Sequence, residues 1–123
     1  MQLLTSSIRL NDICLYAYHG VSAMEKKVGC KFRISLKLDC HIASESYIHD
    51  NLDGTVDYGK VYETVKKAFL PTCNLLEHAA WLTGEALLQA FPLITCVHIE
   101  VEKLDPPIGG ECKSASVALT MTR

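Results

Sequence analysis

Every second residue is apolar from Phe32 to Ile42, and this alternation is the strongest structural signal in the chain. Successive side chains of a β-strand point to opposite faces, so a period of two predicts a strand with one buried face. The same period returns from Thr95 to Lys103 and again from Ala115 to Met121. The buried face of the first of these strands is expected to hold Phe32, Ile34, Leu36, Leu38, Cys40 and Ile42.

An earlier strand is predicted from Ile8 onward, although its apolar residues do not keep one parity. Ile8 and Leu10 belong to one face, whereas the apolar residues from Ile13 belong to the other. A bulge near Asn11 would reconcile the two halves, because one extra residue reverses the face. This strand and the next are joined through residues 20–29, a connection long enough to carry function.

Between the two groups of strands the apolar spacing changes to that of amphipathic helices. A first helix is predicted from Tyr58 to Phe69, and Pro71 ends it because proline cannot continue helical hydrogen bonding. A second helix follows Asn74 and ends before Pro92, with a broad apolar stripe that includes several alanines. Small residues in that stripe favour close packing.

The resulting order of elements is ββααββ, which predicts an α+β fold with two helices on one face of a four-stranded antiparallel sheet. One domain is expected over residues 1–123, because the chain has no linker-like stretch and the length of a single domain. The two edges of such a sheet must be covered or paired. Since 49% of the residues are apolar, we expect pairing between subunits and therefore a homo-oligomer.

Composition argues against several classes of protein. The 12 Lys and Arg and 14 Asp and Glu give a net charge of −2 without runs of either sign, which disfavours nucleic-acid and anionic-membrane binding. Residues 1–10 resemble no secretory leader and no stretch reaches the ~18 apolar residues of a membrane span, so a cytoplasmic location is expected. The six cysteines and five histidines lack metal-site spacings. We therefore expect reduced thiols, no catalytic metal and no cofactor.

Lys103 breaks the pattern, because it keeps the parity of Val97, Ile99 and Val101 and should point to the buried face. A lysine is costly to bury. One interpretation places Lys103 past the strand end, where its side chain reaches solvent, and the pattern alone favours this. The other interpretation is a desolvated amine suited to acid–base chemistry.

Three further residues have an ordinary interpretation beside a functional one. Glu77 completes a predicted capping box with Asn74 as N-cap, yet a carboxylate in a first helical turn can also accept two N–H donors from a planar ligand. Tyr58 fits the packing face of its helix, and Glu25 lies in a charged stretch typical of a solvated loop. The residues alone therefore predict an α+β oligomer with one unusually placed lysine.

Four short blocks carry a resemblance to a known family. They are Tyr16 to Gly20 with Glu25 and Gly29, then Thr55 to Tyr58, then Asn74 to Glu77, and finally Lys103 to Ile108. Each block is weak alone, but together, in this order and spacing over most of the chain, they resemble the dihydroneopterin aldolase family.

The resemblance implies the tunnelling fold, a ββααββ unit whose subunits join edge to edge into rings of four, commonly stacked into octamers. Active sites then lie between neighbouring subunits. Members cleave a small pterin, 7,8-dihydroneopterin, to 6-hydroxymethyl-7,8-dihydropterin and glycolaldehyde in folate biosynthesis. They use neither a Schiff base nor a metal, because the ring imine of the pterin accepts the electrons.

The resemblance also assigns substrate-binding residues. Glu77 resembles the glutamate that anchors the amino-pyrimidinone edge of the pterin, helped by backbone groups of Leu76 and of Val56 from the neighbouring subunit. Asp57 belongs to the same block as Val56 and is expected among the substrate-binding residues.

Three catalytic residues follow in the same way. Lys103 resembles the lysine that takes a proton from the side-chain hydroxyl, through a water. Tyr58, supplied by the neighbouring subunit, resembles the tyrosine that helps to protonate and release the enol intermediate. Glu25 resembles the loop glutamate near the hydroxylated tail of the substrate.

Two stretches depart from the family pattern, although neither contains a proposed catalytic residue. Gly109-Gly110 replaces a usual Pro-Gly, and Trp81 stands where a charge is usual. The nearest alternative is epimerisation of dihydroneopterin or its triphosphate, for which Lys26, Lys27 and Lys113 are candidate phosphate ligands. A non-catalytic oligomeric pterin-binding protein is another. The zinc-dependent pyruvoyl-tetrahydropterin synthases are disfavoured because their histidine pairing is absent.

Overall fold

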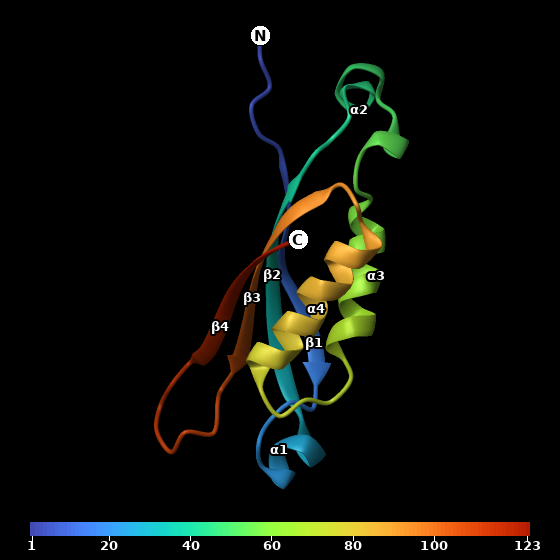
Figure 1. Ribbon diagram of the computed structural model, residues 1–123. Helices are drawn as coiled ribbons and strands as arrows, with labels where there is room; N and C mark the ends of the chain where they lie inside the picture. Colours follow the sequence, from blue (N-terminus) through green and yellow to red (C-terminus); the bar gives the residue numbers. More distant parts are fainter.

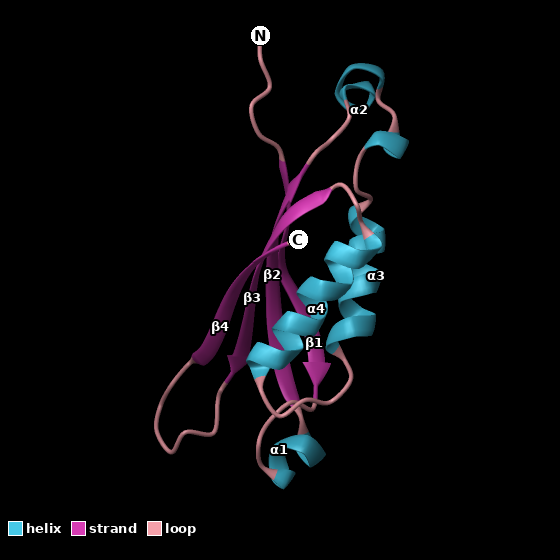
Figure 2. Cartoon of the chain, viewed as in Figure 1, coloured by secondary structure: helices cyan, strands magenta, loops and turns pink.

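The structure is a computed structural model that describes residues 1–123, and it is built in two layers. A four-stranded sheet forms one layer, and the two longest helices cover one of its faces (Figures 1 and 2). The elements are β1 (Ser7–Ala17), α1 (Ala23–Val28), β2 (Cys30–Cys40), α2 (Ser44–His49), η1 (Leu52–Gly54), α3 (Tyr58–Phe69), α4 (Leu76–Ala90), β3 (Ile94–Leu104) and β4 (Ser114–Thr122). The predicted α+β class and sheet are confirmed, with the short helices α1 and α2 added.

The strands are antiparallel and lie in the order β1, β2, β3, β4, so β1 and β4 form the edges. The predicted bulge is present, because the register between β1 and β2 shifts between Leu10 and Ile13. Within the bulge Asp12 has a φ of 56°, and its backbone N–H donates to Ser35 Oγ at 3.1 Å. The apolar residues of both halves of β1 therefore face the helices.

Helix α3 begins at Tyr58 because Asp57 acts as its N-cap. The Asp57 carboxylate accepts a hydrogen bond from the backbone N–H of Gly59 at 2.9 Å, which satisfies one of the free donors of the first turn. The helix ends at Phe69, before Pro71, as predicted. Its buried face holds Val61, Val65 and Phe69.

The predicted capping box at the start of the second helix is wrong. α4 begins at Leu76 with Leu75 in the N-cap position, and no side chain caps it. Asn74 lies one residue too early to cap, and Glu77 stands at the second helical position rather than the third. The Glu77 side chain is exposed, so its carboxylate is free for another role.

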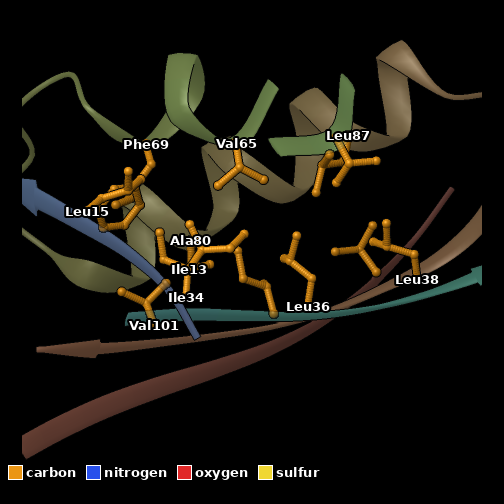
Figure 3. Packing of buried hydrophobic residues seen from close by; sticks show 14 of the residues in the cluster. Ile13, Leu15, Ile34, Leu36, Leu38, Val65, Phe69, Ala80, Leu87 and Val101 are labelled. Carbon is orange, nitrogen blue, oxygen red and sulfur yellow. The ribbon is translucent and has the colours of Figure 1, made fainter. Parts of the chain in front are cut away.

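One hydrophobic core joins the sheet to the helices. In Figure 3 the side chains of Leu36 and Leu38 on β2 point toward the helical layer, where Val65 and Leu87 lie. Truncating a large buried residue in such a core typically costs about 2–5 kcal/mol. Gly84 lets α4 approach β4 closely, because a Cβ at this position would overlap the sulfur of Met121.

All six cysteines are free thiols. None of the helices combines the length and apolar character needed to cross a membrane.

Candidate active site

Lys103 lies on the buried face of β3, where it pairs with Phe32 of β2. Only 7% of the residue is exposed, so the interpretation that places it in solvent beyond the strand is wrong. Its ammonium donates to the backbone carbonyl of His19 at 3.1 Å and forms an ion pair with the Glu25 carboxylate. The Nζ atom also lies 5.9 Å from the centre of the Phe32 ring. A charged amine is thus held within an otherwise apolar layer.

Glu25 reaches Lys103 from α1, which is short but well capped. The Ser22 hydroxyl accepts from the Glu25 backbone N–H at 3.1 Å, while Glu25 Oε1 accepts from the Ser22 backbone N–H at 3.2 Å. This reciprocal pair is a capping box, and it leaves Oε2 directed at Lys103. The hydrogen bond from Lys103, followed by that from the Ser22 backbone, lowers the pKa of Glu25 below its usual 4.5.

The His19 side chain joins three segments of the chain beneath Lys103. Its Nδ1 accepts from the backbone N–H of Cys73 at 2.9 Å, so the proton lies on Nε2, which donates to the carbonyl of Phe69 at 2.7 Å. Burial lowers the pKa of His19 below 6.5, with a smaller contribution in the same direction from the Lys103 charge. A neutral imidazole therefore ties the end of β1 to the end of α3 and orients the carbonyl that Lys103 uses.

The turn between β1 and α1 is tightly built around Glu25. A Cβ at Gly20 would overlap the Glu25 side chain, so only glycine fits there. The backbone N–H of Gly20 donates to the Cys73 carbonyl at 3.0 Å. Lys26 Nζ donates to the carbonyls of Gly20 and Val21 at 2.8 and 3.2 Å. These bonds close the loop on itself and hold it against the segment between α3 and α4.

A cavity of about 190 Å³ opens beside this cluster. Its lining includes His19, Glu25 and Lys103, together with Pro107 of the loop after β3. Small-molecule sites usually enclose roughly 300–1,000 Å³. The single chain therefore offers only part of a pocket for a drug-sized ligand.

Glu77 lies at the same end of the molecule as Lys103. Figure 1 shows the start of α4, the end of β3 and helix α1 grouped at the lower end of the sheet. The carboxylate of Glu77 is exposed in the first turn of α4, where the helix dipole favours negative charge, and Leu76 beside it is half-buried.

Tyr58, Val56 and Asp57 lie at the opposite end of the helical layer. Tyr58 starts α3 and Phe69 ends it, so about 16 Å of helix separates Tyr58 from the carbonyl to which His19 is bonded. Tyr58 is 69% exposed, which corrects its interpretation as a packing residue, whereas Val56 is 4% exposed. The fold thus brings Lys103 and Glu25 together and leaves Tyr58 remote within one chain.

Two residues of the site were not singled out by sequence reasoning for a role of their own. Ser22 was detectable, because Ser22 and Glu25 have the S-x-x-E spacing of a capping box. His19 was not, because its partners Phe69 and Cys73 lie at least 50 residues away along the chain.

Comparison with known proteins identifies the family. The family model described as dihydroneopterin aldolase (FolB) matches residues 8–120. The chain is 31% identical over 117 residues to the dihydroneopterin aldolase of Streptococcus pyogenes serotype M18, covering 94% of this chain and 98% of the relative. It is 32% identical over 115 residues to that of Staphylococcus epidermidis, covering 91% and 93%. The chain belongs to the dihydroneopterin aldolase family.

A solved structure agrees on the fold. The crystal structure of Escherichia coli dihydroneopterin aldolase in complex with neopterin superimposes with a TM-score of 0.84 at 18% identity. The superposition covers 94% of this chain and 98% of the other. The predicted tunnelling fold is therefore confirmed, as is the family resemblance carried by the four blocks.

Proposed function

We propose that this protein cleaves 7,8-dihydroneopterin by a retro-aldol reaction into 6-hydroxymethyl-7,8-dihydropterin and glycolaldehyde, a step of folate biosynthesis. The observation that carries the proposal is the buried Lys103 amine, held by Glu25 and the His19 carbonyl at the edge of a cavity. Membership of the dihydroneopterin aldolase family supports the same reaction.

Lys103 is the proposed base. Removal of a proton from the hydroxyl on the carbon that becomes the aldehyde lets the adjacent carbon–carbon bond break. The electron pair of that bond passes into the pterin ring imine, and the side-chain carbon that stays attached to the ring later takes up a proton. An ammonium has no free electron pair, so Lys103 acts as the base only after it releases one proton to solvent. The neutral amine, held beside the His19 carbonyl and the Glu25 carboxylate, then takes up the hydroxyl proton through a water. Glu25 holds this amine and faces the hydroxylated tail.

Glu77 is the proposed anchor for the pterin. Its exposed carboxylate, which caps nothing, can accept two parallel N–H donors from the amino-pyrimidinone edge. Backbone groups of Leu76 are proposed to help, as are Val56 and Asp57 from a neighbouring subunit. A two-point contact fixes the orientation of the ring as well as its affinity.

Tyr58 is proposed to act in the site of a neighbouring subunit, where it protonates and releases the enol. Its 69% exposure supports this proposal. So does its position about 16 Å along α3 from Phe69, whose carbonyl is bonded to the His19 side chain beside Lys103. The unpaired edges of β1 and β4 supply surfaces for association. We accordingly propose a homo-tetramer or homo-octamer that works in the cytoplasm.

The proposal is tested by incubating the purified oligomer with 7,8-dihydroneopterin and a metal chelator. Release of glycolaldehyde with equal formation of 6-hydroxymethyl-7,8-dihydropterin is expected. Failure to release glycolaldehyde would overturn it, and so would release that the chelator abolishes. The same preparation is assayed for inversion of a side-chain carbon, so that dominant epimerisation without cleavage identifies an epimerase instead.

A further inference from the structure

A second cluster of reactive side chains lies on the sheet face opposite the helices. Cys96 and His98 are two residues apart on β3 and therefore point to the same side, and Asp39 of β2 pairs in register with Cys96. His98 Nε2 lies 3.0 Å from Asp39 Oδ2 and 3.5 Å from Cys96 Sγ. All three candidate ligand atoms lie within 4.8 Å of one another.

We propose that Asp39, Cys96 and His98 bind one divalent transition-metal ion of the zinc type. Zinc takes sulfur, imidazole nitrogen and carboxylate oxygen ligands at about 2.0–2.3 Å, so two ligands of a tetrahedral ion lie roughly 3.3–3.6 Å apart. The two separations that involve His98, 3.0 and 3.5 Å, are close to this spacing, and the ligand atoms of Cys96 and Asp39 lie within 4.8 Å of each other. A mixed Cys, His and Asp set selects zinc-like ions over magnesium or calcium, which prefer oxygen ligands.

Thr120 of β4 supports the ligand role of His98. Without an ion, His98 Nε2 lies 3.0 Å from Asp39 Oδ2 and donates its proton to that carboxylate oxygen. An ion bound at Nε2 takes the place of this proton, and the tautomer with its proton on Nδ1 then donates to Thr120 Oγ1, 3.3 Å away. A metal-bound histidine commonly has such an outer partner for its second nitrogen.

Lys37 is the competing cation at this site. Its ammonium lies 3.8 Å from Asp39 Oδ1, whereas the other carboxylate oxygen faces His98. The two oxygens therefore serve different partners, and the Lys37 side chain, 40% exposed, is free to turn away when an ion binds. The cluster adjoins a groove of about 320 Å³ lined by Lys37, His98 and Thr120, through which an ion can enter.

The proposed ion is separate from the aldolase chemistry. His98 precedes Lys103 by five residues on the same strand. Because five is an odd number, the two side chains point to opposite faces of the sheet, and their Cα atoms lie about 17 Å apart along the strand. The ion links β2 to β3 and is expected to stabilise the sheet. Cleavage of the pterin in the presence of a chelator is compatible with this site, so the two proposals fail independently.

The experiment titrates the purified, chelator-treated oligomer with Co²⁺ alone. One ion per chain is expected, with the near-ultraviolet absorption of a cobalt–thiolate bond, and Zn²⁺ should displace it. Absence of the band, or binding of less than one ion per chain, would overturn the proposal.

Variants separate this site from adventitious binding. Cys96→Ser should abolish the thiolate band, while the matched variant Cys14→Ser, which removes an exposed thiol of β1, should keep it. His98→Gln retains the thiol and should weaken binding at least about 100-fold, the upper end of the loss typical of an outer partner. Thr120→Val should weaken it about 10–100-fold. A thiolate band that survives in Cys96→Ser, or unchanged affinity in His98→Gln, would contradict the assignment.

Discussion

The functional side chains at the two ends of the helical layer differ in how many partners they find within one chain. At the end where α3 stops, Lys103, Glu25 and His19 are joined by hydrogen bonds to partners from three parts of the chain. At the end where α3 starts, Tyr58 projects into solvent, although the helix below it is capped and packed.

This difference supports the proposal of a catalytic centre divided between copies of the chain. A buried amine needs its partners in the same subunit, because an unpaired charge is costly during folding. An exposed phenol has no such cost and can be supplied across an interface. The base should therefore be sensitive to changes within its own subunit, and the phenol to changes in assembly.

The largest effect is expected for Lys103→Met. Removing the base should lower kcat for glycolaldehyde release about 10³–10⁴-fold, within the range of general acid–base catalysis, while pterin affinity changes little. Steady-state kinetics and equilibrium binding of the product pterin measure the two quantities. Lys113→Met, at an exposed position, is the control. Near-normal kcat in Lys103→Met would show that another group is the base.

Tyr58→Phe should lower kcat about 10²-fold, because a single proton donor is lost. Its melting temperature should stay close to that of the parent protein, since the side chain is largely exposed. Differential scanning calorimetry beside the kinetic assay tests both expectations. A large loss of stability with little change in kcat would assign Tyr58 to structure rather than chemistry.

Glu77→Ala should act mainly on binding. Loss of a charge-assisted two-point contact worth about 1.5–3 kcal/mol raises the dissociation constant for pterin about 10–100-fold. Glu85→Ala, on the same helix, is the matched control. If Glu77→Ala lowered kcat and left pterin affinity unchanged, the anchoring role would be misassigned.

The smallest effect concerns pH and the Lys103–Glu25 pair. Because the folded pKa of Glu25 lies below 4.5, its carboxylate stabilises the folded state fully above about pH 4.5. That stabilisation falls as the pH drops through 4.5 and is lost below the lowered folded pKa. Glu25→Gln should be less stable by about 1–3 kcal/mol at pH 7 and approach the parent protein in acid. Chemical denaturation at several pH values measures the difference, and a constant gap would contradict the pairing.

Much of the fold was predictable because the strands have one buried face. The alternation from Phe32 onward, the parity change around Asn11 and the helical spacing from Tyr58 all gave correct elements. The start of α4 was mispredicted because Asn74 has the residue type of an N-cap but not its position. Helix α1 was missed because its six residues bury no side chain.

The candidate site was less predictable. Parity identified Lys103, but nothing local indicates that Glu25, 78 residues earlier, is its partner. That pairing depends on the sheet register and on the turn at Gly20. The metal-ligand cluster likewise joins Asp39 to Cys96 and His98 through the register of β2 and β3, which a search for local spacings cannot find.

Mixed oligomers give the most direct test of a divided catalytic centre. Lys103→Met and Tyr58→Phe chains are co-expressed in equal amounts. A complete site then needs Lys103 from a Tyr58→Phe chain and Tyr58 from a neighbouring Lys103→Met chain, so about a quarter of the sites should regain full activity. The specific activity should then exceed the mean of the two variants purified separately. An activity equal to that mean would show that each chain supplies its own Tyr58 and Lys103.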